Sequence, residues 1–359
     1  MAVSTTSIVS LGAATALLFL LPLAAVLWWK LGHKTSTHWR FVLFGALGFL
    51  VSARVLEAGV HMVCIVLDSP VSRFINGHTW AYALYGCAMA GIFEECGRWV
   101  ILKYLVKKNK TRENALLYGL GHWGIEVWTV VLPNLILALA MGLTIQAQGL
   151  DAALAAFGVT PEVQASYATF LDSYVFGFGP LTAALNVLER VLALFLQVGL
   201  TIVVYYGAGT DNKRYLWWAV LAHGGTDLLA ALYQRGVVSL PLAELWFLLW
   251  AVGVSLWATK LYRRCKGLDT AACPDVSCTR KGAEGMHWKK LIAPIIITVL
   301  VCIWFLFYIA VVLWIPGLPT VVRILGAVIP ALLGGVAIYN LIQRIQEIRS
   351  GEEDDLDNY

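Results

Sequence analysis

Charged residues are scarce in this 359-residue chain, in which Asp, Glu, Lys and Arg together make up 13%. An ordinary soluble domain contains about 25% charged residues, so a soluble globular fold is excluded. Hydrophobic residues make up 59% and the mean hydropathy is +0.74, which indicates a polytopic membrane protein. The net charge of +4 does not indicate a nucleic-acid partner, because the basic residues gather in loops between apolar segments.

The chain also lacks a disulfide framework of the secreted type, although it contains seven cysteines. Several of them lie in apolar segments, where cysteine acts as a small buried hydrophobic residue. The three in a basic loop, Cys265, Cys273 and Cys278, do not have the spacing of a standard zinc finger. We therefore expect reduced thiols with no role of their own.

Nine apolar runs have the length of about 20 residues that a helix needs to cross a ~30 Å hydrocarbon core. They lie near 7–29, 41–66, 80–106, 115–142, 180–206, 215–234, 241–262, 290–315 and 319–342. The sequence therefore predicts an all-α membrane helical bundle of about nine transmembrane helices.

The distribution of basic residues predicts the orientation of these helices. No basic residue precedes the first run, so it lacks the positive region of a secretory signal and is expected to be a retained span. Lys and Arg gather in alternate loops, near 30–40, 107–112, 213–214 and 263–290. The positive-inside rule places these loops in the cytoplasm. We expect the N-terminus outside, the C-terminus inside, and a place in the cell (cytoplasmic) membrane.

Composition divides the chain into four parts. Residues 1–262 form a seven-span core, and 263–289 form a basic cytoplasmic loop. Residues 290–344 form an appended pair of spans, and 345–359 form an acidic cytoplasmic tail.

Three of the core spans contain ionisable residues that a bilayer disfavours. Each costs roughly 2.5–3.5 kcal/mol at the centre of a spanning helix, so such residues are functional candidates by default. The seven are Glu94, Glu95, Arg98, His122, Glu126, His223 and Asp227. A single one could simply hydrogen-bond a neighbouring helix, but seven together favour a functional site.

The rise of a helix places these residues at one depth. Glu94 lies about 14 Å from Lys103, which marks an expected membrane edge. His122 lies about 10 Å from the edge at residue 115, and His223 about 12 Å from the edge at residue 215. We therefore expect three helices to converge on one chamber. Carboxylates and imidazoles serve as general bases and metal ligands, so this chamber is suited to hydrolysis.

A second polar layer is predicted further from that edge. It contains Arg54 and Glu57 in one span and Glu189 and Arg190 in another. Arg54 and Arg190 both lie roughly 20–25 Å from the edge. We expect a structural clamp in which Arg54 pairs with Glu189 and Glu57 with Arg190.

Four motifs in residues 1–262 resemble those of the YhfC-type intramembrane metalloproteases, which are relatives of the PrsW and CAAX-prenyl (type II) protease families. FEECGR at 93–98 matches E-E-x-x-R, and GHWGIE at 121–126 matches G-H-x-G-x-E. ER at 189–190 matches the third motif, and HGGTD at 223–227 matches H-x-x-x-D. The third motif of the family continues to a histidine, where this chain has Gln197. Gln197 lies about 14 Å from Tyr206, in the same layer as the other groups.

The resemblance implies an endopeptidase that hydrolyses a peptide bond in or near the membrane. Glu94 would be the base that activates water, and Glu95 and Arg98 would support it. The substrate would be a membrane-embedded or lipidated protein or peptide.

The resemblance also implies a metal, which would be Zn²⁺. His122, Glu126 and His223 would bind the metal or the water directly. Asp227 or Gln197 would help to polarise the scissile carbonyl, and Gln197 could occupy a ligand position.

Two other functions remain open. Glutamine is a poorer zinc ligand than imidazole, so this member could be a catalytically inactive scaffold or chaperone. The same superfamily contains the scaffold subunit of gamma-secretase, whose third span resembles residues 91–108. A solute or ion transporter is the third alternative, because buried carboxylates and histidines also form proton relays. The chain shows no internal repeat of the kind that many transporters have.

Overall fold

The computed structural model describes residues 3–268 except 35, 107–108 and 161–166, together with isolated positions between 295 and 345. The chain divides into two compact units, Met1–Ala153 with Pro161–Cys273, and Leu154–Thr160 with Pro274–Tyr359. Most of the predicted basic loop, the predicted spans at 290–344 and the tail at 345–359 lie outside the described residues. Those parts of the domain organisation stay predictions.

Every regular element in the described part of the chain is helical. Short wide π-helical segments (η1 to η5) interrupt or extend several α-helices, and η6 is a 3₁₀ turn. The elements are α1 (Thr5–Gly32), α2 (Arg40–Phe49), η1 (Leu50–Glu57), α3 (Ala58–His61), η2 (Met62–Val66), α4 (Pro70–Gly77), α5 (Thr79–Val100), η3 (Ile101–Leu105), α6 (Arg112–Glu126), η4 (Val127–Val131), α7 (Leu132–Gln148), α8 (Leu150–Ala156), η5 (Leu171–Phe176), α10 (Pro180–Gly209), α11 (Arg214–Gln234), α12 (Leu240–Arg264) and η6 (Cys265–Gly267).

Five helical segments in the described residues are long and apolar enough to cross a membrane. They are Thr5–Gly32, Arg40–Val66, Arg112–Gln148, Pro180–Gly209 and Leu240–Arg264. Two further predicted spans, at 80–106 and 215–234, are also helices, namely α5 with η3, and α11. They are less apolar because α5 carries Glu94, Glu95 and Arg98, and α11 carries His223 and Asp227. The chain is an all-α membrane protein with several spans.

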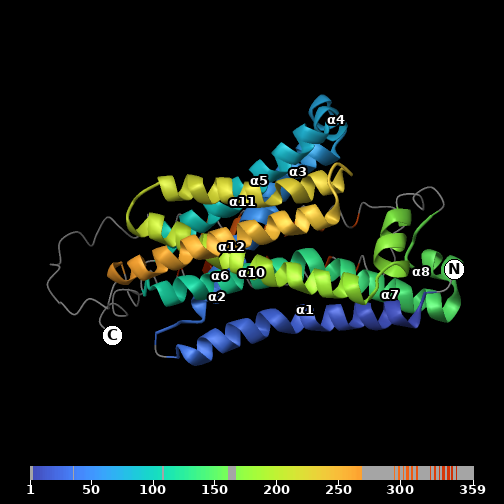
Figure 1. Ribbon diagram of the computed structural model, residues 1–359, viewed down its shortest axis with the longest axis horizontal. Helices are drawn as coiled ribbons and strands as arrows, with labels where there is room; N and C mark the ends of the chain where they lie inside the picture. Colours follow the sequence, from blue (N-terminus) through green and yellow to red (C-terminus); the bar gives the residue numbers. More distant parts are fainter. Residues whose placement is uncertain are drawn as a thin grey trace. The chain divides into compact units, whose positions relative to one another are not determined.

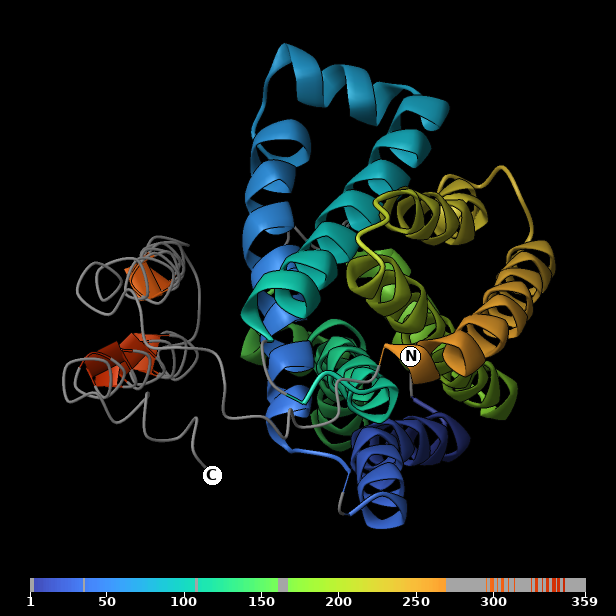
Figure 2. The same cartoon turned by 90° about the vertical axis from the view of Figure 1, so that its left-hand side faces the viewer.

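Helix α10 is the central helix of the first unit, because it contacts α1, α5, α6, α11 and α12. Around it, α5 packs along α11, and α2 packs along α6 (Figure 1). Figure 2 shows α5 (cyan) running obliquely beside α11 (yellow). The buried core lies where these helices meet and includes Trp99, Tyr118, Leu200 and Ala219.

Two glycines let these pairs approach until their backbones touch. A Cβ on Gly121 of α6 would lie 2.2 Å from the Val42 carbonyl oxygen of α2. A Cβ on Gly224 of α11 would lie 2.7 Å from the Cys87 carbonyl oxygen of α5. Each glycine adjoins a histidine in the sequence, His122 or His223. The close crossings therefore fix the positions of both imidazoles.

A wide π-helical segment, η4, follows Glu126 directly. Pro133 lies near the start of α7 and has no N–H to donate to the carbonyl of Thr129. The missing bond explains why the regular α-helical pattern is broken at this point. Such wide turns inside helices are frequent at functional sites.

Candidate functional site

Four helices supply the polar side chains of the site. Helix α5 supplies Glu94, Glu95 and Arg98, α6 supplies His122 and Glu126, α10 supplies Gln197, and α11 supplies His223 and Asp227. The structure brings all eight into one contact network at the centre of the first unit.

Glu95 and Arg98 form the most deeply buried part of this network. Nη1 of Arg98 donates to both carboxylate oxygens of Glu95 at 2.9 Å, and both side chains are 0% exposed. Oε1 of Glu95 also lies 2.8 Å from Nδ1 of His223. The carboxylate therefore ties α5 to α11 and leaves Nε2 of His223 facing the rest of the site.

The second terminal nitrogen of Arg98 reaches two other helices. Nη2 lies 3.0 Å from Nε2 of His122 and donates to Oε1 of Gln197 at 2.5 Å. A guanidinium only donates, so Nε2 of His122 accepts and the ring proton is assigned to Nδ1. Nδ1 is buried and has no hydrogen-bond partner among the described residues.

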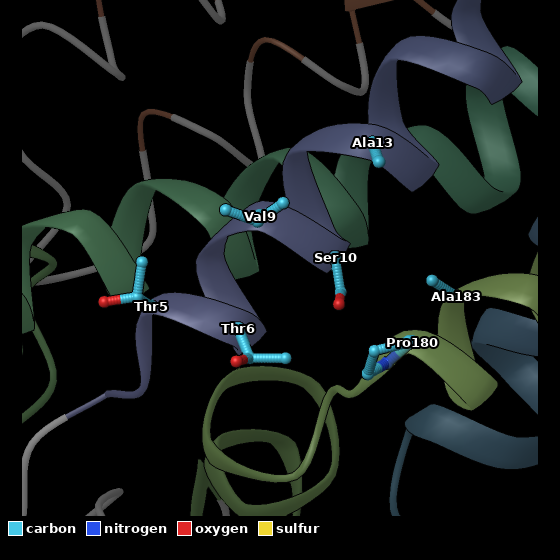
Figure 3. Close-up of a pocket in the computed structure, with 7 residues that line it drawn as sticks. All are labelled: Thr5, Thr6, Val9, Ser10, Ala13, Pro180 and Ala183. Atoms are coloured by element: carbon cyan, nitrogen blue, oxygen red, sulfur yellow. The ribbon is translucent and has the colours of Figure 1, made fainter.

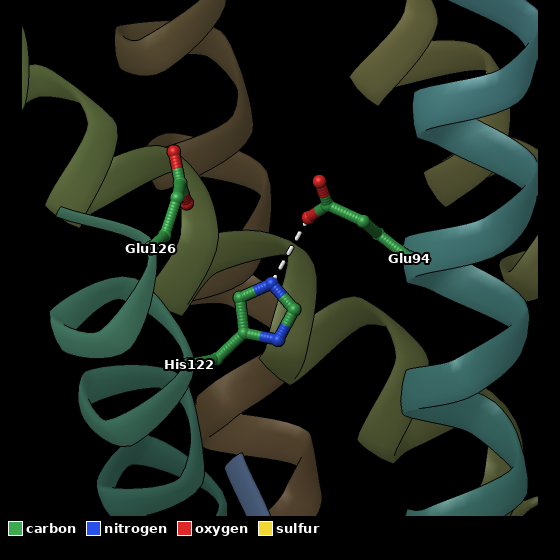
Figure 4. Close-up of side chains that lie close together, drawn as sticks. All are labelled: Glu94, His122 and Glu126. Carbon is green, nitrogen blue, oxygen red and sulfur yellow. Dashed lines mark hydrogen bonds and ion pairs between the residues drawn. The ribbon is translucent and has the colours of Figure 1, made fainter. Parts of the chain in front are cut away.

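Glu94 lies at the centre of the site. Its Oε2 is 3.0 Å from Nε2 of His122, 3.4 Å from Nε2 of Gln197 and 3.9 Å from Nε2 of His223. Figure 4 shows the other carboxylate oxygen of Glu94 pointing away from His122. Because Nε2 of His122 accepts from Arg98, two acceptors face each other across 3.0 Å. Nε2 has one lone pair, so either a proton on Glu94 shares it with Arg98, or a cation bound between Glu94 and His122 replaces the contact with Arg98.

Glu94, His122 and Glu126 meet the requirements of a metal site. Among the described residues, these three offer ligand atoms that all lie within 4.8 Å of one another. They converge from α5 and α6 (Figure 4). Carboxylate oxygen and imidazole nitrogen are the usual ligands of a catalytic zinc ion, at about 2.0–2.2 Å. The 3.0 Å contact is close to the separation of two ligands of one such ion, so the residues fit a divalent cation.

This group differs from the predicted metal set in one member. His223 was expected to be a ligand, but its Nε2 is 3.9 Å from both Glu94 and Asp227, and its Nδ1 contacts Glu95. Glu94, expected as the base, lies in the group instead. The difference arises because Glu94 and Glu95 point to different helices.

Gln197 occupies the predicted layer but not as a ligand. Its oxygen accepts from Arg98, and its Nε2 donates to Oε2 of Glu126 at 2.9 Å. The amide thus presents N–H groups, and not a lone pair, to the carboxylates.

The predicted crossed pairing in the second polar layer is wrong. Arg190 pairs with its neighbour Glu189 and lies 3.5 Å from Oε1 of Glu126. Glu57 pairs with His61 at 3.2 Å, and the side chain of Arg54 is exposed. Segment η1 packs mainly against α2, α3 and α5 and so does not bring Arg54 and Glu57 to α10.

Three aromatic residues near the site were missed by the sequence analysis. Nε1 of Trp123 donates to the carbonyl of Arg190 at 2.9 Å, and Tyr85 lies 2.9 Å from Nδ1 of His61. The hydroxyl of Tyr118 is buried and has no hydrogen-bond partner in the part of the chain that the structure describes. The polar atom of a Trp or Tyr in a spanning helix is the signal that could have identified them.

Exposure rises across the site in one direction. Glu95 and Arg98 are 0% exposed and Glu94 is 9% exposed, whereas the side chains of Asp227 and Glu189 are 37% and 36% exposed. Access to Glu94 therefore lies on the side of Asp227 and Glu189.

A separate surface cavity of about 450 Å³ lies between α1 and α10. Figure 3 shows its lining, which consists of Thr5, Thr6, Val9, Ser10, Ala13, Pro180 and Ala183. None of these side chains is a general acid or base near neutral pH. This cavity is therefore not the candidate catalytic site.

Comparison with known proteins gives two matches. The chain matches the sequence profile described as YhfC intramembrane metalloprotease over residues 17–247, a range that contains every site residue above. It is 30% identical over 236 residues to the uncharacterized membrane protein YhfC of Bacillus subtilis (strain 168). The aligned region covers 66% of this chain and 88% of that relative. No solved structure matches the chain at a significant level.

Proposed function

Because this chain belongs to the YhfC intramembrane metalloprotease family, we propose that it is an intramembrane endopeptidase with Glu94 as the water-activating base. One observation carries the proposal: the Glu94 carboxylate lies in a buried cluster of polar side chains, 3.0 Å from His122 and 3.9 Å from His223. A general base must be held close to the water that it activates and be screened from bulk solvent.

Glu94 has one oxygen for this task. Oε2 is engaged by His122, so Oε1 accepts the proton of the attacking water. Glu94 then returns the proton to the leaving amine when the peptide bond breaks. Glu95 accepts from Nδ1 of His223, which favours positive charge on that ring, as in carboxylate–histidine pairs. The protonated Nε2 can then donate to the developing oxyanion.

Zn²⁺ is the proposed metal, and Glu94, His122 and Glu126 would hold it. When bound, the ion supplies Lewis-acid polarisation and lowers the pKa of a water molecule. His223, with its Nδ1 on Glu95, stays available to the substrate.

We propose nine spans in the cell membrane, with the N-terminus outside and the C-terminus inside. The basic loops near 30–40 and 107–112 support this orientation. The proposed substrate is a membrane-embedded or lipidated protein or peptide, because the base lies among helices that are apolar enough to span a bilayer.

Glu94→Gln in the purified full-length protein tests the function. We expect the wild-type protein in proteoliposomes to cleave members of a library of tagged transmembrane peptides, read by mass spectrometry. The Gln variant should lower the rate by about 10²–10⁴-fold, the usual contribution of a general base. Glu113→Gln is the matched control, because Glu113 lies on α6 and pairs with Arg112, outside the network around Glu94. Equal cleavage by the Glu94 variant would remove the mechanism.

The two alternatives give different outcomes in the same preparation. A scaffold or chaperone would cleave nothing and would co-purify with a stable partner. A transporter would take up solute in a proton- or sodium-coupled manner, and Glu94→Gln would abolish the uptake.

A further inference from the structure

Gln197 is an uncharged side chain in the hydrogen-bond network around Glu94, and the proposed reaction does not use it. It is 3% exposed and lies on α10, opposite α5 and α6. Its Oε1 accepts from Nη2 of Arg98 at 2.5 Å. Its Nε2 lies 2.9 Å from Oε2 of Glu126 and 3.4 Å from Oε2 of Glu94.

The neighbours on the two sides fix the orientation of this amide independently. Arg98 only donates, so it requires the amide oxygen, and ionised carboxylates only accept, so they require the amide nitrogen. A rotation by 180° would place N–H groups against the guanidinium and the oxygen against two carboxylates. Both contacts would be repulsive, so the amide oxygen is withheld from any metal ion.

Arg98 is itself held in place by Glu95, through two contacts of 2.9 Å. Glu95 therefore positions Arg98, and Arg98 positions the Gln197 amide. The amide in turn contacts the carboxylates of Glu94 and Glu126. The two carboxylates would repel each other, and the N–H groups of Gln197 offset this repulsion by bonding to both.

We propose that Gln197 is a positioning residue that holds Glu94 and Glu126 together as metal ligands without binding the metal itself. The inference rests on the proposed function for its purpose, since it concerns the same site. Groups that hydrogen-bond metal ligands in this way typically contribute 10–100-fold to metal affinity.

Binding of Co²⁺ alone to the full-length protein in detergent, followed by its visible absorption, tests this role. The variants are Gln197→Met, which keeps the size but not the hydrogen bonds, and Gln197→His, which offers a new ligand. Gln146→Met, at an exposed position of α7, is the matched control.

We expect Gln197→Met to weaken Co²⁺ binding by about 10–100-fold while the positions of the absorption bands stay as in the wild type. Gln197→His should bind Co²⁺ more tightly and shift the bands, because an imidazole joins the ligands. The control should match the wild type. Unchanged affinity of the Met variant, or shifted bands in it, would overturn the proposal.

Gln197→His decides the matter if the Met variant does not fold, as judged by size-exclusion chromatography and thermal unfolding. Identical spectra for the His variant and the wild type would overturn the proposal, as would no binding by either protein. Binding by the His variant alone would also overturn it, because Gln197 would then support no metal site, whereas binding by both proteins with shifted bands in the His variant would support it. These readouts need no peptide substrate, so a failure of the Glu94→Gln cleavage test is distinguished from a failure here.

Discussion

Glu94 and Glu95 are adjacent in the sequence, yet their carboxylates contact different helices. Oε2 of Glu94 lies 3.0 Å from Nε2 of His122 on α6, and Oε1 of Glu95 lies 2.8 Å from Nδ1 of His223 on α11. Successive residues of a helix point about 100° apart, so one dipeptide supports two imidazoles. Glu95 is also paired with Arg98, whereas Glu94 keeps its Oε1 for the proposed reaction.

Glu95→Gln should destabilise the fold. The substitution leaves Arg98 buried without an anionic partner, and a broken buried pair costs about 3–5 kcal/mol. Glu113→Gln disrupts the partly exposed Arg112–Glu113 pair and should cost only about 0–1 kcal/mol. Thermal unfolding of the full-length protein in detergent measures both. The double variant Glu95→Gln/Arg98→Met should lose less stability than the sum of the losses in the two single variants. Equal losses in Glu95→Gln and Glu113→Gln would contradict the role of Glu95.

Metal content should depend on the group of Glu94, His122 and Glu126. We expect about one divalent metal ion per chain by elemental analysis, if three protein ligands form a catalytic site of the usual kind. His122→Ala and Glu126→Ala should each lose most of it. His61→Ala is the control, because His61 pairs with Glu57 outside this group. Full metal content in the His122 variant would argue against this site.

Gly224→Ala should disturb the α5–α11 crossing. The added Cβ would lie 2.7 Å from the Cys87 carbonyl oxygen, a backbone atom that cannot move without shifting α5. Overpacking of this kind typically costs about 1–3 kcal/mol. Gly253→Ala on α12 is the control, because nothing lies within 4 Å of its added Cβ. The melting temperature should fall for the first variant and be unchanged or slightly higher for the second; equal melting temperatures would show that the crossing is loose.

His38, in the loop between α1 and α2, should make stability depend on pH. Partial burial, with Arg40 and Lys30 nearby, lowers its pKa from the ordinary value of 6.5. Its Nε2 lies 2.8 Å from Nδ2 of Asn109, a donor that suits the neutral ring. A lowered folded-state pKa contributes stability that is complete above about pH 6.5 and is lost as the pH falls towards the folded-state pKa.

We therefore expect the melting temperature to fall as the pH drops from about 7 to 5, and the fall to be smaller in His38→Gln. The exposed His78→Gln serves as the control. An unchanged pH dependence in the His38 variant would exclude this contribution.

The sequence alone predicted the helices and the layer of the site. Within the described residues, apolar runs of the right length predicted the helices, and the constant rise of a helix placed Glu94, His122 and His223 in one layer. These arguments succeed because they need only one helix at a time.

The pairing of side chains between helices could not be predicted in the same way. It depends on which helices are neighbours and on their rotation about their own axes. Arg54 was assigned to Glu189 from depth alone, but η1 packs mainly against α2, α3 and α5. The orientation of the Gln197 amide likewise depends on Arg98, 99 positions away in the sequence.

The rise in exposure from Glu95 to Asp227 and Glu189 has a consequence for what the protein can accept. If a peptide segment reaches Glu94 from this exposed side, it meets Asp227 and the Glu189–Arg190 pair first. Like charges facing each other in a poorly hydrated opening repel strongly. We expect segments with acidic side chains beside the scissile bond to bind weakly and be cleaved slowly, and segments with a lysine or arginine there to bind more tightly.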